Sequence, residues 1–284
     1  MAPRRILLDT AFLLHRAFHA TARHADRMRD AHGRPDNALR GLVGTVERLR
    51  ATPAGPPHAG AAPATGVLAA WDCAWRPTWR TALVPSYKAH RLATAGDGAE
   101  RVDPRLAEQF PRAVAVLTGL GVPVMGAADC EADDVLATLA EQGPAWIVTG
   151  DRDLCQVVDD AAQVGLLLLG RTGDRWVDES AVQAMSGVQP ASYVDFAVLR
   201  GDPSDGLAGA AGIGAVTAAR LLAEFGTLED LLAAAAAGDP RLPARQALTL
   251  SRGAADLRAA RAVVTLRRDA PLESLSAEGY TPEA

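Results

Sequence analysis

The sequence Ala145-Trp-Ile-Val-Thr-Gly-Asp151 is a short apolar run that stops at an acid. A run of this length without polar alternation is typical of a strand that is buried on both faces of a parallel sheet. Arg4 to Thr10 and Gly66 to Asp72 have the same form, and each carries an aspartate near its carboxyl end. Ligands of open α/β sheets bind outside the carboxyl ends of the strands, so the repeated acids predict a binding site at that edge.

Helical patterns lie between these strands. Val164 to Leu169 is a further apolar run, which we predict to be a fourth strand. Strands that alternate with helices predict an α/β fold with a parallel sheet. The segments whose apolar residues recur at helical spacing are 37–50, 104–120 and 132–142.

A loop and a change of pattern divide the chain. The stretch from 51 to 65 is rich in Pro, Ala and Gly, which is typical of a loop. After Asp178 only helical patterns remain. We therefore expect a sheet domain over residues 1–178 and a helical region over residues 179–284.

Acidic residues gather at the predicted strand ends and turns. The densest group is Cys130-Glu-Ala-Asp-Asp134 at a predicted helix start, where the helix dipole would by itself explain the charge. Thr149-Gly-Asp-Arg-Asp153 follows a strand, and Arg200-Gly-Asp-Pro-Ser-Asp205 lies on a turn. The recurrence makes chance a poor explanation. The nine acids are Asp9, Asp72, Glu131, Asp133, Asp134, Asp151, Asp153, Asp202 and Asp205.

Crowded carboxylates are costly unless cations lie among them. Oxygen ligands alone select hard cations such as Mg²⁺ or Mn²⁺, and the His and Cys residues show no zinc spacing. Two such ions, about 4 Å apart, can activate a water molecule and stabilise the leaving oxygen of a phosphodiester. No GxxxxGK[ST] loop is present, so the sequence favours phosphoryl transfer to water over nucleotide-driven work.

Taken alone, the overall charge disfavours a nucleic-acid partner, because 29 Lys and Arg stand against 34 Asp and Glu. Cations bound at a carboxylate cluster would neutralise part of that charge.

No apolar run has membrane-spanning length, and the first residues lack the form of a signal peptide, so we expect a cytoplasmic protein without a membrane partner. Three well-separated cysteines, Cys73, Cys130 and Cys155, predict free thiols.

Basic residues follow Asp72 along the chain. Arg80, Lys88 and Arg91 lie in one segment directly after that strand end. An ordinary solvated surface would explain them, and so would a set of cations that hold a phosphate beside the metal site. The sequence leaves both interpretations open.

A glycine turn, Gly212-Ile213-Gly214, precedes a helical pattern that includes Arg220. No strand comes before it, so the dinucleotide-binding fingerprint does not apply. A glycine turn at a helix amino terminus offers backbone N–H groups to a phosphate. The turn is weak evidence alone and gains weight from its position just after Asp205.

Taken together, these motifs resemble the 5′-nuclease superfamily, which includes flap endonucleases, phage 5′-exonucleases and the 5′-nuclease domain of bacterial DNA polymerase I. The resemblance extends over nearly the whole chain. It implies a PIN-like Rossmannoid sheet flanked by helices, followed by a helix–three-turn–helix module. It also implies a 5′-3′ exonuclease or flap endonuclease that hydrolyses DNA by a two-metal mechanism. We expect a stand-alone monomer that acts on DNA with 5′ ends, nicks or flaps.

The resemblance assigns each motif a role. One divalent cation would lie among Asp9, Asp72, Glu131, Asp133 and Asp134. The other would lie among Asp151, Asp153, Asp202 and Asp205. The cations near the scissile phosphate would be Lys88, Arg80 and Arg91. The DNA-binding residues would be His15, Arg16, Phe18, Gly212, Ile213, Gly214 and Arg220. A potassium ion is expected at the Gly212–Gly214 turn.

Some positions depart from the family pattern. Thr10 stands where Gly is usual, His15 where Tyr is usual, and Cys130 where an aromatic residue is usual. Gly206 replaces Asn, and Ala211 replaces a frequent Lys, which removes one phosphate contact. No acidic ligand is missing, which argues against an inactive relative.

Two other functions compete with this interpretation. A non-catalytic DNA-junction binding protein would tolerate the loss of metal ligands, and the complete acidic set disfavours it. An RNA-cleaving PIN-like nuclease would lack the glycine turn, so the segment from Asp205 to Arg220 argues against it.

Overall fold

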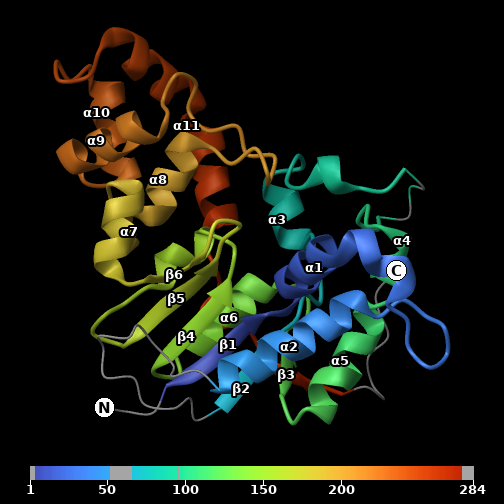
Figure 1. The fold of residues 1–284 in the computed structure, drawn as a ribbon. Coiled ribbons are helices and arrows are strands. Elements are labelled where there is room, and N and C mark those ends of the chain that lie inside the picture. The colour runs from blue at the N-terminus through green and yellow to red at the C-terminus, as the bar shows by residue number, and fades with distance from the viewer. Residues whose placement is uncertain (1–3, 52–65, 95, 97, 277–284) are drawn as a thin grey trace.

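The structure is a computed structural model that describes residues 4–51, 66–94, 96 and 98–276. Most of the predicted loop at 51–65 lies outside these residues. Within them, one sheet has the strand order β6-β5-β4-β1-β2-β3-β7 (Figure 1). The strands are β1 Arg5–Asp9, β2 Gly66–Ala70, β3 Val124–Gly126, β4 Ala145–Thr149, β5 Val164–Leu169, β6 Asp174–Val177 and β7 Glu273–Leu275.

The five central strands of the sheet run parallel to their neighbours, as predicted for an α/β fold; in sheet order they are β5, β4, β1, β2 and β3. The strands at both edges are antiparallel to their neighbours. The four strands expected from apolar runs are all present. The three additional strands, β3, β6 and β7, have only three or four residues each and no continuous apolar run.

Helices cover both faces of the sheet. Side chains of β1 alternate, so Ile6 and Leu8 pack with the helices of one face whereas Leu7 packs on the other. The first face carries α1 Thr10–Thr21, α2 Asn37–Ala51 and α5 Phe110–Gly119. The second face carries α6 Ala132–Ala140.

The predicted helix over 104–120 is divided into α4 Pro104–Ala107 and α5. Pro111 has no N–H to donate to an earlier turn, so a continuous helix cannot pass through it. Gln109 lies between the two pieces, and its Oε1 accepts a hydrogen bond of 2.8 Å from the backbone of Ala38 at the start of α2. At the break between α4 and α5, Gln109 therefore links the start of α5 to the start of α2 on the same face of the sheet.

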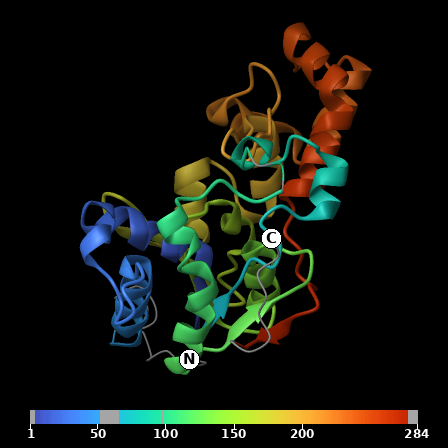
Figure 2. The ribbon, with the colours of Figure 1, turned by 90° about the vertical axis from the view of Figure 1, so that its right-hand side faces the viewer.

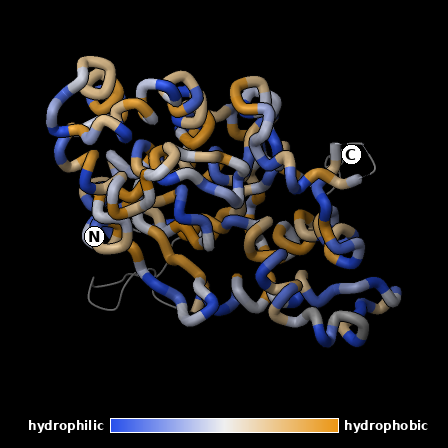
Figure 3. Tube along the Cα trace, turned by 90° about the horizontal axis from the view of Figure 1, so that it is seen from above, coloured by the Kyte–Doolittle hydropathy of each residue, from blue (hydrophilic) through white to orange (hydrophobic). Residues whose placement is uncertain are grey.

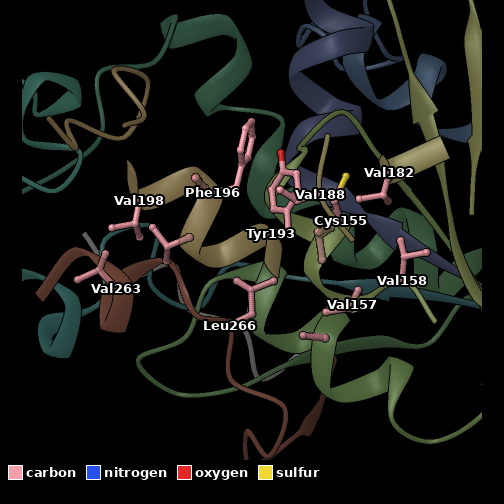
Figure 4. Close-up of a cluster of buried hydrophobic side chains, with 14 of the residues drawn as sticks. Cys155, Val157, Val158, Val182, Val188, Tyr193, Phe196, Val198, Val263 and Leu266 are labelled. Atoms are coloured by element: carbon pink, nitrogen blue, oxygen red, sulfur yellow. The ribbon is translucent and has the colours of Figure 1, made fainter. Parts of the chain in front are cut away.

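A helical region follows the sheet domain in the chain, as predicted. Its helices are α7 Glu179–Ser186, α8 Tyr193–Arg200, α9 Ala215–Phe225, α10 Leu228–Ala237 and α11 Ala244–Val264. Its apolar side chains join the core of the second sheet face, where Tyr193, Phe196 and Val263 lie near Cys155 and Val157 (Figure 4). Hydrophobic and hydrophilic segments alternate along the chain, and hydrophobic ones occur both in the middle of the molecule and in the helices at its periphery (Figure 3).

The chain does not stay helical to its end. After α11 it returns to the sheet, where β7 pairs with β3 (Figure 2). On the way the backbone N–H of Leu266 donates to Gln156 Oε1 at 3.0 Å, and that of Ala270 to Thr138 Oγ1 at 3.1 Å. The prediction that strands cease after residue 178 is therefore wrong, because a three-residue edge strand gives too little pattern to detect.

No described helix is long and apolar enough to cross a membrane. The three cysteines are free thiols, as predicted.

Candidate active site

Asp9 lies at the carboxyl end of β1 and is almost fully buried. Its carboxylate accepts hydrogen bonds from the backbone N–H of Phe12 at 3.1 Å and from the hydroxyl of Thr149 at 2.7 Å. The same hydroxyl oxygen accepts a bond of 3.0 Å from the N–H of Asp151. Burial raises the pKa of Asp9 to about 6. The side chain of Thr149, at the end of β4, is therefore hydrogen-bonded both to Asp9 at the end of β1 and to Asp151, which follows β4.

Asp72 follows β2 and points toward the start of α6. Its Oδ1 accepts a hydrogen bond of 2.8 Å from the backbone N–H of Ala132. Burial raises the pKa of Asp72 to about 7, and the nearby carboxylates of Asp9 and Glu131 add to the rise. The β1 and β2 acids therefore lie close enough to repel each other.

The acids at the start of α6 have different surroundings. Burial raises the pKa of Asp133 well above its ordinary value, with further contributions from Asp151, Asp9 and Glu131. Glu131 pairs with the ammonium of Lys88 and accepts a hydrogen bond of 2.6 Å from the hydroxyl of Tyr87. Asp133 and Glu131 thus extend the acidic group formed by the strand ends.

Asp134 is placed apart from these acids. It is fully buried, and both of its oxygens accept hydrogen bonds from Arg80, at 2.9 and 2.7 Å. Its Oδ1 also accepts a bond of 3.0 Å from the backbone N–H of Arg267. In this arrangement Asp134 holds Arg80 rather than facing the cleft, which does not fit its predicted role as a metal ligand.

A second acidic group follows β4 and α8. Burial raises the pKa of Asp153 well above its ordinary value, and Asp151, Asp205 and Asp202 raise it further. Asp151 also acts on Asp9 and Asp133, so it links the two groups. Electrostatic interactions therefore link all the predicted acids except Asp134, from the carboxyl edge of the sheet to the loop after α8.

The loop that carries Asp202 and Asp205 is closed by two glycines. Gly201 and Gly209 have φ values of +80° and +55°, and a Cβ on either would lie within 3.0 Å of the other's backbone. The backbones of Asp202 and Leu207 exchange two hydrogen bonds of 2.9 Å. Glycine is needed at both ends for this close approach, which the sequence alone did not indicate.

Lys88 and Arg91 lie in the cleft between the two acidic groups. The backbone N–H of Lys88 donates to the carbonyl of Asp205 at 2.9 Å, and its ammonium pairs with Glu131. Although burial opposes it, the Glu131 carboxylate raises the pKa of Lys88 well above its ordinary value. Arg91 donates to Asp205 Oδ1 at 3.0 Å, and its side chain is 33% exposed.

Arg80 lies under the cleft, with its side chain only 1% exposed. Its guanidinium pairs with Glu131 and Asp134, and Nε donates to the carbonyl of Val263 at 3.0 Å. It therefore joins α3 Thr78–Leu83 to α6 and to the end of α11. Because no phosphate can reach so buried a group, the structure does not fit the predicted contact between Arg80 and the scissile phosphate.

The predicted DNA-binding residues of α1 are divided between surface and core. His15 is half-buried and lines the cleft beside Asp9 and Asp72. Arg16 turns toward the β5–β6 connection, where it lies 3.4 Å from Asp174. Phe18 is 2% exposed and packs in the core of the first sheet face, so the structure does not fit its predicted contact with DNA.

The glycine turn lies at the start of α9, as predicted. Gly212 has a φ of +80°, and a Cβ on Gly212 or Gly214 would meet no atom within 4 Å. Ile213 between them is 3% exposed and packs into the core. Its side chain anchors the turn and is not available to DNA, so only the backbone and the exposed Arg220 can make the predicted contact.

The donor set suits hard cations, since the clustered side chains are carboxylates whose burial, and to a smaller extent whose crowding, raises several of their pKa values. Among the residues that the structure describes, no three His, Cys, Asp or Glu side chains are arranged to hold an ion at one point. Glu131 is instead paired with Lys88, Tyr87 and Arg80. The cleft thus contains the required oxygens but not a finished coordination shell.

Comparison with known proteins identifies both parts of the chain. The family model described as "5'-3' exonuclease, N-terminal resolvase-like domain" matches residues 4–187, and "5'-3' exonuclease, C-terminal SAM fold" matches residues 188–282. A protein named 5'-3' exonuclease from Streptomyces coelicolor is 44% identical over 274 residues, which cover 94% of this chain and 87% of that protein. One of the same name from Mycobacterium tuberculosis is 36% identical over 281 residues, with 94% and 85% coverage.

A solved structure described as the T5 D15 protein co-crystallized with metal ions has the same fold. Its TM-score is 0.66 at 17% sequence identity, over 92% of this chain and 89% of that one. This likeness supports the arrangement of a parallel sheet and a following helical region over nearly the whole length.

Proposed function

The chain belongs to the 5'-3' exonuclease family, and we propose that it hydrolyses DNA phosphodiesters near 5′ ends, nicks or flaps at the acidic cleft. The observation that carries this proposal is the set of interacting carboxylates that extends from Asp72 at the sheet edge to Asp205 on the loop after α8. Such a series suits two hard cations, which we propose to be Mg²⁺ or Mn²⁺.

Two groups of side chains would hold these cations. One consists of Asp9, Asp72, Glu131 and Asp133, and the other of Asp151, Asp153, Asp202 and Asp205. When bound, the cations would lower the pKa of a water molecule that attacks the phosphate. Their positive charge would also stabilise the leaving oxygen. Asp134 is not included, because Arg80 and the backbone of Arg267 occupy its oxygens.

The cleft's own cations would act on the phosphate. Lys88 is held at the centre by its backbone bond to Asp205, so its ammonium needs only to leave Glu131 to meet a phosphate oxygen. Arg91 would steady a neighbouring phosphate from the cleft surface, since one third of its side chain is exposed. Arg80, by contrast, is a positioning residue that keeps Glu131 turned toward the cleft.

The glycine turn would grip the retained duplex. Gly212 and Gly214 leave open space in front of the amino terminus of α9, whose free N–H groups suit a phosphate. We propose that this contact uses the backbone, with a potassium ion among the turn carbonyls. The glycine turn also favours a DNA nuclease over an RNA-cleaving PIN-like enzyme, because enzymes of that class are shorter and lack such a turn.

A substrate panel tests the function. Purified protein is mixed with 5′-flap, nicked, blunt and single-stranded DNA, each labelled at the 5′ end, and with a single-stranded RNA of the same sequence. With Mg²⁺ or Mn²⁺ we expect cleavage near the 5′ end of flap and nicked DNA, and none with Ca²⁺ or excess EDTA. Cutting of the RNA alone would favour the RNA-cleaving alternative, and binding of every DNA without cleavage would favour the junction-binding alternative.

A further inference from the structure

The cleft contains a further carboxylate, Glu100, which belongs to none of the acidic motifs. Glu100 lines the catalytic cleft, a cavity of about 320 Å³, together with Lys88 and Glu131. It also lines an adjoining cavity of about 410 Å³. Asp72 and Glu100 are among the residues that line both cavities. A DNA strand that extends from the cleft into the adjoining cavity therefore passes the side chain of Glu100.

A short hairpin fixes Glu100 at this point. The backbone N–H of Arg101 donates to the carbonyl of Arg91 at 2.7 Å. The backbone N–H of Ala93 donates to the carbonyl of Ala99 at 2.8 Å. These two bonds hold Glu100 beside Arg91, so that Oε1 of Glu100 lies 3.9 Å from Nη1 of Arg91. The backbone of the hairpin therefore sets the position of the carboxylate.

Glu100 lies against one part of the Arg91 guanidinium. Nη2 of Arg91 donates to the carbonyl of Ser204 at 2.7 Å and to Asp205 Oδ1 at 3.0 Å, whereas Nη1 is the nitrogen near Glu100. Burial raises the pKa of Glu100, and the charges of Arg91 and Lys88 act against that rise, so the carboxylate is ionised at pH 8. A phosphate on this side of Arg91 therefore meets an anion as well as a cation.

The adjoining cavity is also unfavourable for a phosphate. Its described lining residues include three acids, Asp72, Glu100 and Asp129. Arg76 is the only Lys or Arg among them, and its guanidinium donates to two backbone carbonyls, each at 2.6 Å. Even with Asp72 bound to a cation, the other two acids outnumber Arg76. A strand that enters this cavity is therefore most stable where it carries no phosphate.

The glycine turn and Glu100 lie beside different acidic groups. The turn follows Asp205, which belongs to the second group, whereas Glu100 lies next to Asp72 of the first. According to the proposed function, the turn holds the duplex that remains after cleavage. A strand held in this way brings the 5′ side of the scissile bond to Glu100.

We propose that Glu100 is a specificity-determining residue that repels the phosphate on the 5′ side of the nucleotide next to the scissile bond. When the first nucleotide is removed at a nick, a 5′-hydroxyl end has no phosphate there, whereas a 5′-phosphate end and a flap each have one. The enzyme therefore favours 5′-hydroxyl ends. This inference rests on the proposed function, because it takes a DNA strand in the cleft as its premise.

An uncharged linkage in the DNA tests the repulsion directly. A 5′-flap DNA carries one methylphosphonate, either one nucleotide to the 5′ side of the scissile phosphate or four nucleotides farther into the flap. Binding of each DNA is measured with Ca²⁺ at pH 8. Removal of one like charge near a carboxylate strengthens binding by roughly 3- to 30-fold, and we expect this gain at the first position only. Unchanged or weaker binding with the first linkage would overturn the proposal.

Glu100→Gln removes the charge and keeps the size of the side chain. This variant should bind the unmodified flap as tightly as the wild type binds the flap with the first methylphosphonate. The methylphosphonate should then give the variant no further gain, because the two changes remove the same repulsion. A full additional gain would mean that another group repels the phosphate, and would contradict the proposal.

Cleavage of nicked DNA with Mg²⁺ separates this role from a simple effect on Arg91. Glu100→Gln should cut the nick with a 5′-phosphate roughly 3- to 30-fold faster at low DNA concentration, and the nick with a 5′-hydroxyl at the wild-type rate. Glu47→Gln, an exposed residue of α2, is the matched control and should leave both rates unchanged. An equal gain on both nicks would mean that Glu100 only restrains Arg91, and would overturn the proposal.

The two proposals fail in different ways. Wild-type cleavage of the flap with Mg²⁺ but no effect of the first methylphosphonate would remove the role of Glu100 and leave the nuclease intact. No cleavage of any DNA in the panel would remove the proposed function itself.

Discussion

The guanidinium of Arg80 and the carboxylate of Asp134 form a two-point ion pair, with N–O distances of 2.9 and 2.7 Å, in which both side chains are almost completely buried. Arg80 reaches this position from α3, and Asp134 from the first turn of α6. Arg80 also binds Glu131 and the carbonyl of Val263. The pair thus connects the acidic cleft to the helical region.

Replacement of Arg80 should therefore damage the fold before it affects chemistry. Arg80→Met leaves Asp134 buried without its partner, which costs about 3–5 kcal/mol. Arg91→Met removes an ion pair at the cleft surface and should cost less than about 1 kcal/mol. Urea unfolding of both variants measures the difference. If Arg80→Met is as stable as Arg91→Met, the pair has no structural role.

Lys88 should affect the reaction far more than it affects binding. Removal of a cation aimed at the developing phosphate charge slows a reaction by roughly 10²–10³-fold, and we expect this loss in single-turnover cleavage by Lys88→Ala. Glu131 keeps its bonds to Tyr87 and Arg80, so the fold should persist. His90→Ala, an exposed neighbour, is the matched control. Equal losses in rate and affinity would assign Lys88 to binding alone.

The glycine turn offers a pair of substitutions with opposite effects. Gly212 has a φ of +80°, so Gly212→Ala should destabilise the fold by roughly 1–2 kcal/mol. Gly214 has a φ of −88° and open space around it, so Gly214→Val should leave the melting temperature near that of wild type. The introduced valine side chain should still keep a duplex phosphate away from the backbone of the turn.

Salt titration of binding, with Ca²⁺ present, measures the second effect. Gly214→Val should bind nicked DNA more weakly and with a smaller salt dependence, because a lost phosphate contact releases fewer counterions. Binding of a short single strand should change much less. An equal loss on both DNAs would mean that the turn is only structural.

The acidic cleft should make metal-free stability depend on pH. The pKa values of Asp9 and Asp72 in the fold are about 6 and about 7, above the ordinary 3.8. The unfolded chain therefore releases these protons first, and stability should fall as pH rises from about 4 to about 7. Mg²⁺ should restore more stability at pH 8 than at pH 5.

Melting temperatures with EDTA and with Mg²⁺ across this range provide the measurement. The lowered pKa of His15 acts in the opposite sense below its ordinary value of 6.5, so the wild-type curve contains both effects. Asp72→Asn removes one of the two acids and leaves His15 in place. The metal-free melting temperature of this variant should therefore fall less with rising pH than that of the wild type. A metal-free protein that becomes more stable from pH 5 to pH 8 would contradict this account.

Much of the site could be predicted from the sequence because its acids follow strands with strong apolar patterns. Asp9 and Asp151 lie where a buried strand ends, and the parallel sheet brings such ends together. The edge strand β7 could not be predicted, since three residues carry no period and its pairing with β3 depends on tertiary structure. The family resemblance implies a phosphate contact for Arg80, which the structure does not fit, because sequence position shows the neighbours of Arg80 along the chain but not its contact with the end of α11.

Single-turnover cleavage of a 5′-flap DNA by Asp151→Asn tests the central claim most directly, because Asp151 acts on both acidic groups and the substitution keeps its shape. With Mg²⁺ the wild type should release the 5′ product, whereas the variant should cut more than about 10²-fold slower and bind the same DNA with Ca²⁺ as tightly. Cleavage by the variant at the wild-type rate, or cleavage by the wild type in excess EDTA, would contradict a metal-dependent reaction at this cleft.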